Sequence, residues 1–174
     1  ADNEFDHIVA KDILEHLGDT SSDFINVIKE MYRVSHNGAI WEVQSPHWRC
    51  DTALDDPDHK RLITMGMFNM FNKRMLLEKL RNGQSDSALA FDHDVDIEIA
   101  DMQFEYTPPW EEKIRKREIG QEELNYALNH FNNVALSTKY LIQVHKPGRN
   151  DYSEYEQLVE EKLKQPLKLT SNDV

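Results

Sequence analysis

Four residues of types that bind divalent metal ions occur at a spacing that brings side chains together. Asp12, Glu15 and His16 stand in the stretch AKDILEHL, and His59 stands in DDPDHKR, 43 residues after His16. On a helix, positions i, i+3 and i+4 share one face, so the D-x-x-E-H run would present three ligand side chains together. Two carboxylates and two imidazoles suit Mn²⁺, Fe²⁺, Co²⁺ or Zn²⁺ at least as well as Mg²⁺. The pattern predicts a metal site, and a bound ion would lower the pKa of a hydroxyl group and orient it.

The same residues have a second interpretation, in which no metal is bound. Aspartate, glutamate and histidine also form hydrogen-bond networks, with the carboxylates capping turns and the imidazoles filling space. The loop around His59 adds further ligand-type side chains, either as supports for a metal centre or as an acidic, solvated surface: His47, Asp51, Asp55, Asp56 and Asp58. Both interpretations stay open at the level of the sequence.

Composition narrows the class of protein. The chain has 174 residues, a length typical of one domain. Its net charge of −12 disfavours nucleic acid as a partner, because phosphate binding calls for an excess of Lys and Arg. The single cysteine, Cys50, excludes an internal disulfide and fits a cytoplasmic protein. No apolar run approaches the roughly 18 residues of a membrane span, and no signal peptide is recognised.

A strand–helix–strand unit is predicted to position the D-x-x-E-H run. Residues 5–10 are short and apolar, which predicts a buried strand, and residues 13–17 predict a helical turn. A helix follows, capped at Ser21 or Ser22 and ending at residues 37–38. Residues 39–43 predict the second strand. Because such crossovers connect parallel strands, the two strands are expected to be parallel.

The rest of the chain predicts further elements of both kinds. In order, these are a loop at 44–66, a helix at 67–82 ended by Gly83, a loop at 84–93, a strand at 95–106 stopped by Pro108-Pro109, a helix at 121–131 and a strand at 134–144. The last two strands are expected to pair antiparallel at a sheet edge. Residues 149–174 are expected to form a charged tail, helical near 152–164.

The order of these motifs resembles the second half of class I S-adenosylmethionine-dependent methyltransferases. That family has an F-D-x-I-x-A strand, an E-H-L turn, a helix ending in R-V-L-K-P-G-G and a strand ending in a small polar residue and proline. The corresponding stretches here are FDHIVAKDILEHL, RVSHNG and AIWEVQSP, followed by DDPDHKRLITMGMF, DIEIADMQFEY and STKYLIQVHKP. The resemblance covers residues 4–148. It implies an α/β, Rossmann-like methyltransferase domain over residues 1–148, with a mostly parallel sheet and an antiparallel C-terminal strand pair.

The cofactor-binding half of that family's fold has no counterpart in this sequence. Family members hold S-adenosylmethionine with a glycine-rich turn after the first strand and an acidic residue after the second. This chain has six glycines, no two of them closer than 17 residues, and no G-x-G. The family's first three strands are therefore expected to be missing. The resemblance still implies S-adenosylmethionine as cofactor, bordered by Ala10 and Lys11 at the end of the first strand.

The family resemblance also bears on the metal. Small-RNA 2′-O-methyltransferases and ubiquinone-pathway O-methyltransferases carry E-x-x-E-H at this place, where it binds a divalent ion that holds the hydroxyl acceptor. The RNA enzymes add a histidine from an H-x-D-H-K-like segment. Glu15, His16 and His59 match this pattern, and Asp12 replaces the first glutamate with a side chain shorter by one methylene. The resemblance thus implies Mg²⁺ or Mn²⁺ bound by all four.

Two functions of different class are compatible with the sequence. The first is metal-assisted, S-adenosylmethionine-dependent methylation of a hydroxyl on a small metabolite or sugar. The second is a catalytically incompetent fragment or interaction module that lacks the cofactor pocket. The strand at 5–10 is internal in the family fold, so without its neighbour it would have an open apolar edge. Such edges are blunted or paired by another chain, and we expect a homodimer through this one.

Overall fold

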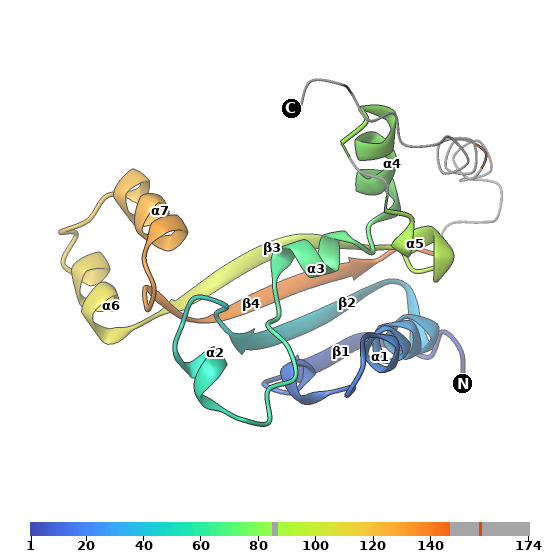
Figure 1. Ribbon diagram of the computed structural model, residues 1–174, viewed down its shortest axis with the longest axis horizontal. Helices are drawn as coiled ribbons and strands as arrows, with labels where there is room; N and C mark the ends of the chain where they lie inside the picture. Colours follow the sequence, from blue (N-terminus) through green and yellow to red (C-terminus); the bar gives the residue numbers. More distant parts are fainter. Residues whose placement is uncertain (85–86, 147–156, 158–174) are drawn as a thin grey trace, which may run out of the picture.

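Two parallel strands and their connecting helix form the first part of the computed structural model, which describes residues 1–84, 87–146 and 157. β1 spans Phe5–Lys11, α1 spans Ser21–Val34 and β2 spans Ser35–Pro46. The two strands pair in parallel, as the strand–helix–strand pattern predicts. Phe24 and Ile28 on α1 are buried, so the helix packs its apolar stripe on the sheet (Figure 1).

Both ends of α1 differ from the prediction by a few residues. Thr20, not Ser21, is the N-cap. Its hydroxyl accepts the Asp23 N–H at 3.2 Å, and the Asp23 carboxylate accepts the Thr20 N–H at 3.0 Å, which completes a capping box. The helix ends at Val34, before the Asn-Gly pair. Gly38, at φ +83°, lies inside β2 where the register with β1 shifts. Gly38, which the sequence placed at a helix end, therefore occupies an irregular position in the strand, where the backbone needs a positive φ.

Two further strands complete a four-stranded sheet of order β1-β2-β4-β3. β3 spans Ile97–Tyr106 and β4 spans Ala135–Val144, and they pair antiparallel at one edge, as predicted. β4 is also antiparallel to β2, so β1, β2 and β3 run in one direction and β4 runs against them. This confirms the predicted α/β class and its antiparallel C-terminal strand pair. The carboxyl ends of β1, β2 and β3 meet at the same end of the sheet (Figure 1).

Short helices occupy connections that the sequence predicted as loop or as one helix. The predicted loop at 44–66 contains α2 (Thr52–Asp55). The predicted helix at 67–82 is two helices, α3 (Met65–Asn69) and α4 (Lys73–Arg81). Asn72 separates them because its side chain accepts the Met75 N–H at 2.8 Å and so starts a new helix. α5 (Leu89–Asp92) lies in the next predicted loop.

A pair of helices between β3 and β4 forms an arm beyond the carboxyl end of β3 (Figure 1). α6 spans Pro108–Arg115 and was not predicted, whereas α7 (Gln121–His130) confirms the helix predicted at 121–131. The Pro-Pro pair follows the end of β3, as expected, but it also begins α6. Proline suits a first helical turn because its φ is already helical and no N–H is needed there.

The hydrophobic core lies on one face of the sheet. Trp41 and Val43 on β2 and Tyr140 and Ile142 on β4 are completely buried, together with side chains of α1 and α3. The opposite face is exposed and carries charged as well as apolar side chains. There Glu42 and the 35% exposed Lys139 form an ion pair at 2.7 Å. Helices therefore cover one face, and solvent contacts the other.

Predictions for residues 149–174, including a helix near 152–164, fall outside the described residues except at position 157, which is helical. Within the described part of the chain, no helix is both long enough and apolar enough to cross a membrane.

Candidate metal centre

The candidate site lies where β1 and β2 end side by side. Lys11 pairs with Gln44 in the last register position, and the Asp12 N–H donates to the Gln44 carbonyl at 2.9 Å. The chain then turns into η1 (Leu14–His16), a short 3₁₀ helix that carries Glu15 and His16. The carboxyl ends of parallel strands are the usual place for ligand sites in α/β sheets.

Glu15 is a buried carboxylate without a hydrogen-bond partner. The residue is 2% exposed, and neither carboxylate oxygen has a partner among the described residues. Burial raises the pKa of Glu15. The backbone N–H of Glu15 lies near the carboxylate, without hydrogen-bond geometry, and lowers this pKa in part. The nearby His16 and His59 also lower the pKa, whereas Asp12 raises it further. A buried, unpaired acid destabilises the folded chain unless a cation accompanies it.

His59 reaches the same point from the loop after β2. Its Nδ1 lies 2.9 Å from the Ala53 carbonyl, which only accepts, so Nδ1 carries the hydrogen and Nε2 keeps a free lone pair. This is the arrangement that orients metal-binding histidines. The loop is fixed to η1 because the Lys60 N–H donates to the Glu15 carbonyl at 2.7 Å.

Three of the four predicted ligands come together. One ligand atom each from Glu15, His16 and His59 lies within 4.8 Å of the others. Atoms bound to one ion at about 2.0–2.2 Å lie at most about 4.4 Å apart, so small side-chain rotations would bring these three atoms around a common ion. One carboxylate and two imidazoles leave coordination positions for solvent or substrate and suit Mn²⁺, Fe²⁺, Co²⁺ or Zn²⁺. The side chains present therefore fit a divalent ion.

The structure does not bring Asp12 into this group. The D-x-x-E-H run was expected to form one helical face, and this expectation is wrong. Asp12 precedes η1 and has φ +48°, in the left-handed region, so the i, i+3, i+4 geometry does not apply. The two residues predicted to border the cofactor lie just before it: Ala10 is buried in the core, and Lys11 is exposed at the strand end.

His47 is buried among aromatic side chains, an environment that could not be predicted from the sequence. It follows the end of β2, is 2% exposed, and its Nδ1 accepts the Arg49 N–H at 3.1 Å. Its ring stacks on Trp48 at 4.0 Å and meets Phe104 edge-on at 5.6 Å. Burial, assisted by the Arg49 charge, lowers the pKa of His47 to about 4. The sequence indicated His47 only as one of the ligand-type side chains in the loop after the second strand, either supporting a metal centre or on a solvated surface, and its burial excludes the solvated alternative.

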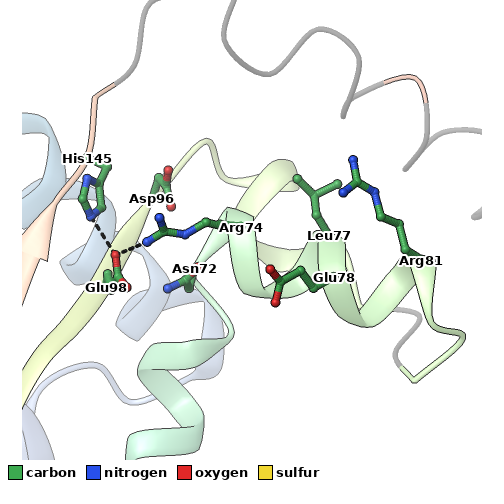
Figure 2. Close-up of a pocket in the computed structure, with 8 residues that line it drawn as sticks. All are labelled: Asn72, Arg74, Leu77, Glu78, Arg81, Asp96, Glu98 and His145. Atoms are coloured by element: carbon green, nitrogen blue, oxygen red, sulfur yellow. Dashed lines mark hydrogen bonds and ion pairs between the residues drawn. The ribbon is translucent and has the colours of Figure 1, made fainter.

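A pocket of about 240 Å³ lies at the other end of the sheet, between α4 and the start of β3 (Figure 2). Arg74 forms an ion pair with Glu98, and His145 Nε2 lies 3.2 Å from the same carboxylate. The Arg74 and Glu98 charges pair with each other, and the pocket is remote from η1. It is not a second candidate for the predicted chemistry.

Comparisons with known proteins bear on the fold. No protein-family model matches the sequence, and no curated protein matches it. Among solved structures, a SAM-dependent methyltransferase from Archaeoglobus fulgidus matches 82% of this chain at 14% identity, with a TM-score of 0.50. The YcgJ protein from Bacillus subtilis matches 84% at 12% identity (TM-score 0.44). Phosphoethanolamine N-methyltransferase 2 from Haemonchus contortus matches 84% at 13% identity (TM-score 0.43).

The chain spans 60% of the length of the archaeal structure. At this identity the likeness concerns the fold alone. The chain has a class I methyltransferase-like fold.

Proposed function

We propose that the chain is the second half of a methyltransferase that uses S-adenosylmethionine to methylate a hydroxyl on a small metabolite or sugar, in the cytoplasm. A divalent ion such as Mn²⁺ or Mg²⁺, bound by Glu15, His16 and His59, assists. The buried Glu15 carboxylate carries this proposal. Among the residues that the structure describes, neither of its oxygens has a hydrogen-bond partner, and two imidazoles lie beside it. A metal ion is the simplest group that would stabilise all three side chains at once.

The chain's own residues have distinct parts in this proposal. When bound, the ion supplies Lewis acidity that lowers the pKa of a coordinated hydroxyl. The Ala53 carbonyl orients Nδ1 of His59, so Nε2 is the ring nitrogen that would bind the ion. His47 stays neutral because of burial, and since Nδ1 accepts a backbone hydrogen bond, its Nε2–H is a donor beside the end of β2. The exposed end of β1 at Lys11 is the proposed border of the cofactor.

Thermal unfolding in the presence of cofactor tests whether this chain is an enzyme by itself. A ligand at about 100 times its Kd stabilises the folded state by about 2.7 kcal/mol, so S-adenosylmethionine should raise the Tm by several degrees. S-adenosylhomocysteine should act similarly, and adenosine should have little effect. An unchanged Tm with both cofactor forms would show that the chain alone does not bind the cofactor.

A second function, an interaction module without catalytic activity, is favoured by the charged side chains on the uncovered face of the sheet. Helices normally cover both faces of a doubly wound sheet. Here the second face carries the Glu42–Lys139 ion pair, with His7 Nε2 3.8 Å from Glu42. Burying these charges under a further helical layer would carry a desolvation cost. Metal binding without any response to S-adenosylmethionine would favour this second function.

A further inference from the structure

We infer that Asn133 is a positioning residue of the metal centre, an inference that rests on the proposed metal-assisted function. Asn133 stands between α7 and β4, at the base of the arm that α6 and α7 form. Figure 1 shows the base of this arm and α2 at the same end of the sheet. Hydrogen bonds connect the two, and through them Asn133 holds the segment that orients His59.

All four hydrogen-bonding groups of Asn133 have partners in neighbouring segments. Its backbone N–H donates to the Arg49 carbonyl at 2.9 Å, and its carbonyl accepts the Thr107 hydroxyl at 2.7 Å. The side-chain Oδ1 accepts the Asp51 N–H at 2.9 Å, and Nδ2 donates to the Asp51 carboxylate at 2.8 Å. Its φ of +58° lies in the left-handed region, which asparagine adopts more readily than most residues. Asn133 therefore joins the base of the arm to the loop after β2.

Asp51 connects this contact to α2. Its carbonyl accepts the N–H groups of Leu54 and Asp55 at 2.8 and 2.9 Å, so it belongs to the first turn of the helix. Within the described chain the Asp51 side chain does not cap α2, and its carboxylate binds Asn133 instead. A helix of four residues is too short to be stable without tertiary contacts. The orientation of α2 therefore depends on contacts outside it, and Asn133 provides two of them.

α2 in turn orients His59. The Ala53 carbonyl, inside α2, lies 2.9 Å from His59 Nδ1. A displaced α2 would lengthen this hydrogen bond and allow His59 to adopt the other tautomer, with the hydrogen on Nε2. That tautomer cannot bind an ion through Nε2, because the lone pair of this atom is then used. Asn133 is not a ligand itself, and it acts on the ligand through Asp51 and Ala53.

The tautomer of His59 in the metal-free protein tests this role directly. Nitrogen NMR of the imidazole distinguishes a hydrogen on Nδ1 from one on Nε2, and the original chain should show mainly the Nδ1–H form. Asn133→Gly removes the amide but keeps the left-handed backbone accessible, and it should shift His59 toward a mixture of tautomers. Asn132→Gly, at the neighbouring exposed position, is the matched control and should leave the tautomer unchanged. Equal His59 spectra for the two glycine variants would overturn the proposal.

The affinity for Mn²⁺ provides a second measurement. Isothermal titration should give an affinity about tenfold lower for Asn133→Gly, at the low end of the range for groups that support metal ligands, and an unchanged affinity for Asn132→Gly. If the original chain bound no Mn²⁺, the proposed metal centre would be contradicted, whereas the His59 tautomer would still decide the role of Asn133.

Exchanging the two side chains separates positioning from general damage to the fold. Asn133→Asp alone places two carboxylates at hydrogen-bond distance, and it should weaken Mn²⁺ binding more than Asn133→Gly does. Adding Asp51→Asn restores both hydrogen bonds, with the side-chain amide now on the other partner. The double variant should therefore recover the Mn²⁺ affinity and the His59 tautomer of the original chain. A double variant that remained as impaired as Asn133→Asp would contradict the proposal.

Discussion

The rings of His16 and His59 meet edge-on, with centroids 4.7 Å apart and an angle of 63° between the planes. The two residues belong to different segments, η1 after β1 and the loop after β2, and the Glu15 carboxylate is the third member of the group. Two imidazoles and a buried acid, which has no hydrogen-bond partner in the described part of the chain, form a site that either holds a cation or destabilises the chain.

Glu15→Gln should remove metal binding and yet stabilise the metal-free protein. Because folding raises the pKa of Glu15 above 4.5, its contribution to stability is present at low pH and is lost as pH rises through the folded-state pKa. The amide carries no charge, so the variant should gain on the order of 1 kcal/mol at neutral pH. Urea unfolding with and without Mn²⁺ measures both effects.

The pH dependence provides the internal control for this variant. Well below pH 4.5 the original carboxyl is protonated in both the folded and the unfolded state, and the two proteins should have similar stability. A Glu15→Gln protein that is less stable than the original at neutral pH would indicate that the carboxylate has a stabilising partner in the metal-free fold.

Asp12→Asn should leave the Mn²⁺ affinity within about threefold, whereas His59→Asn should lower it at least about 100-fold. Asp12 lies outside the group of ligand atoms, and asparagine adopts its left-handed conformation readily. Isothermal titration with Mn²⁺ compares the two variants. A large loss for Asp12→Asn would restore Asp12 as the fourth ligand.

The sequence could predict the ligand types of this site but not their full geometry. Glu15 and His16 follow a strand whose apolar pattern is clear, and His59 follows the next one, so parallel pairing alone places them near each other. Asp12 could not be placed in this way, because its backbone turns out of the strand with a positive φ before the helical turn begins. The role of Ala53 as a hydrogen-bond acceptor depends on the fold of the loop.

His47 should make stability depend on pH between about 4 and 6.5. Its pKa is lowered from 6.5 to about 4 by burial, so between these values the unfolded chain binds the extra proton. Stability is therefore complete above pH 6.5 and falls as the pH decreases, by up to about 3 kcal/mol. His47→Asn, which keeps an acceptor for the Arg49 N–H, should flatten this slope in urea unfolding.

His36→Asn is the matched control for that slope, because the His36 side chain is 60% exposed. Its pH profile should follow that of the original protein. If His47→Asn and His36→Asn gave equal slopes, the buried imidazole would not be the titrating group.

Gly18→Ala should destabilise the turn between η1 and α1 by at least about 2 kcal/mol. Gly18 has φ +75°, and a Cβ there would lie 2.6 Å from the Phe24 backbone nitrogen. Gly66→Ala is a suitable comparison, because its nearest neighbour is the Thr64 hydroxyl at 3.8 Å, and its stability should change by less than about 1 kcal/mol. Thermal unfolding distinguishes them, and equal Tm values would contradict the close approach at Gly18.

The fold was predictable where the apolar periodicity was strong. It was less predictable where a single side chain determines where a helix begins or ends. All four strands and the helices at α1 and α7 were predicted to within a few residues. The break at Asn72 was not, because capping by one side chain overrides a continuous helical pattern. α6 was not predicted either, because Pro-Pro signals both the end of a strand and the start of a helix.

The most direct test of the metal centre is anomalous diffraction from crystals of this chain grown with Mn²⁺. We predict one strong peak within about 2.0–2.6 Å of a Glu15 carboxylate oxygen and of one ring nitrogen each from His16 and His59. No peak at that position at saturating Mn²⁺, with His16 hydrogen-bonded to protein instead, would contradict the metal centre.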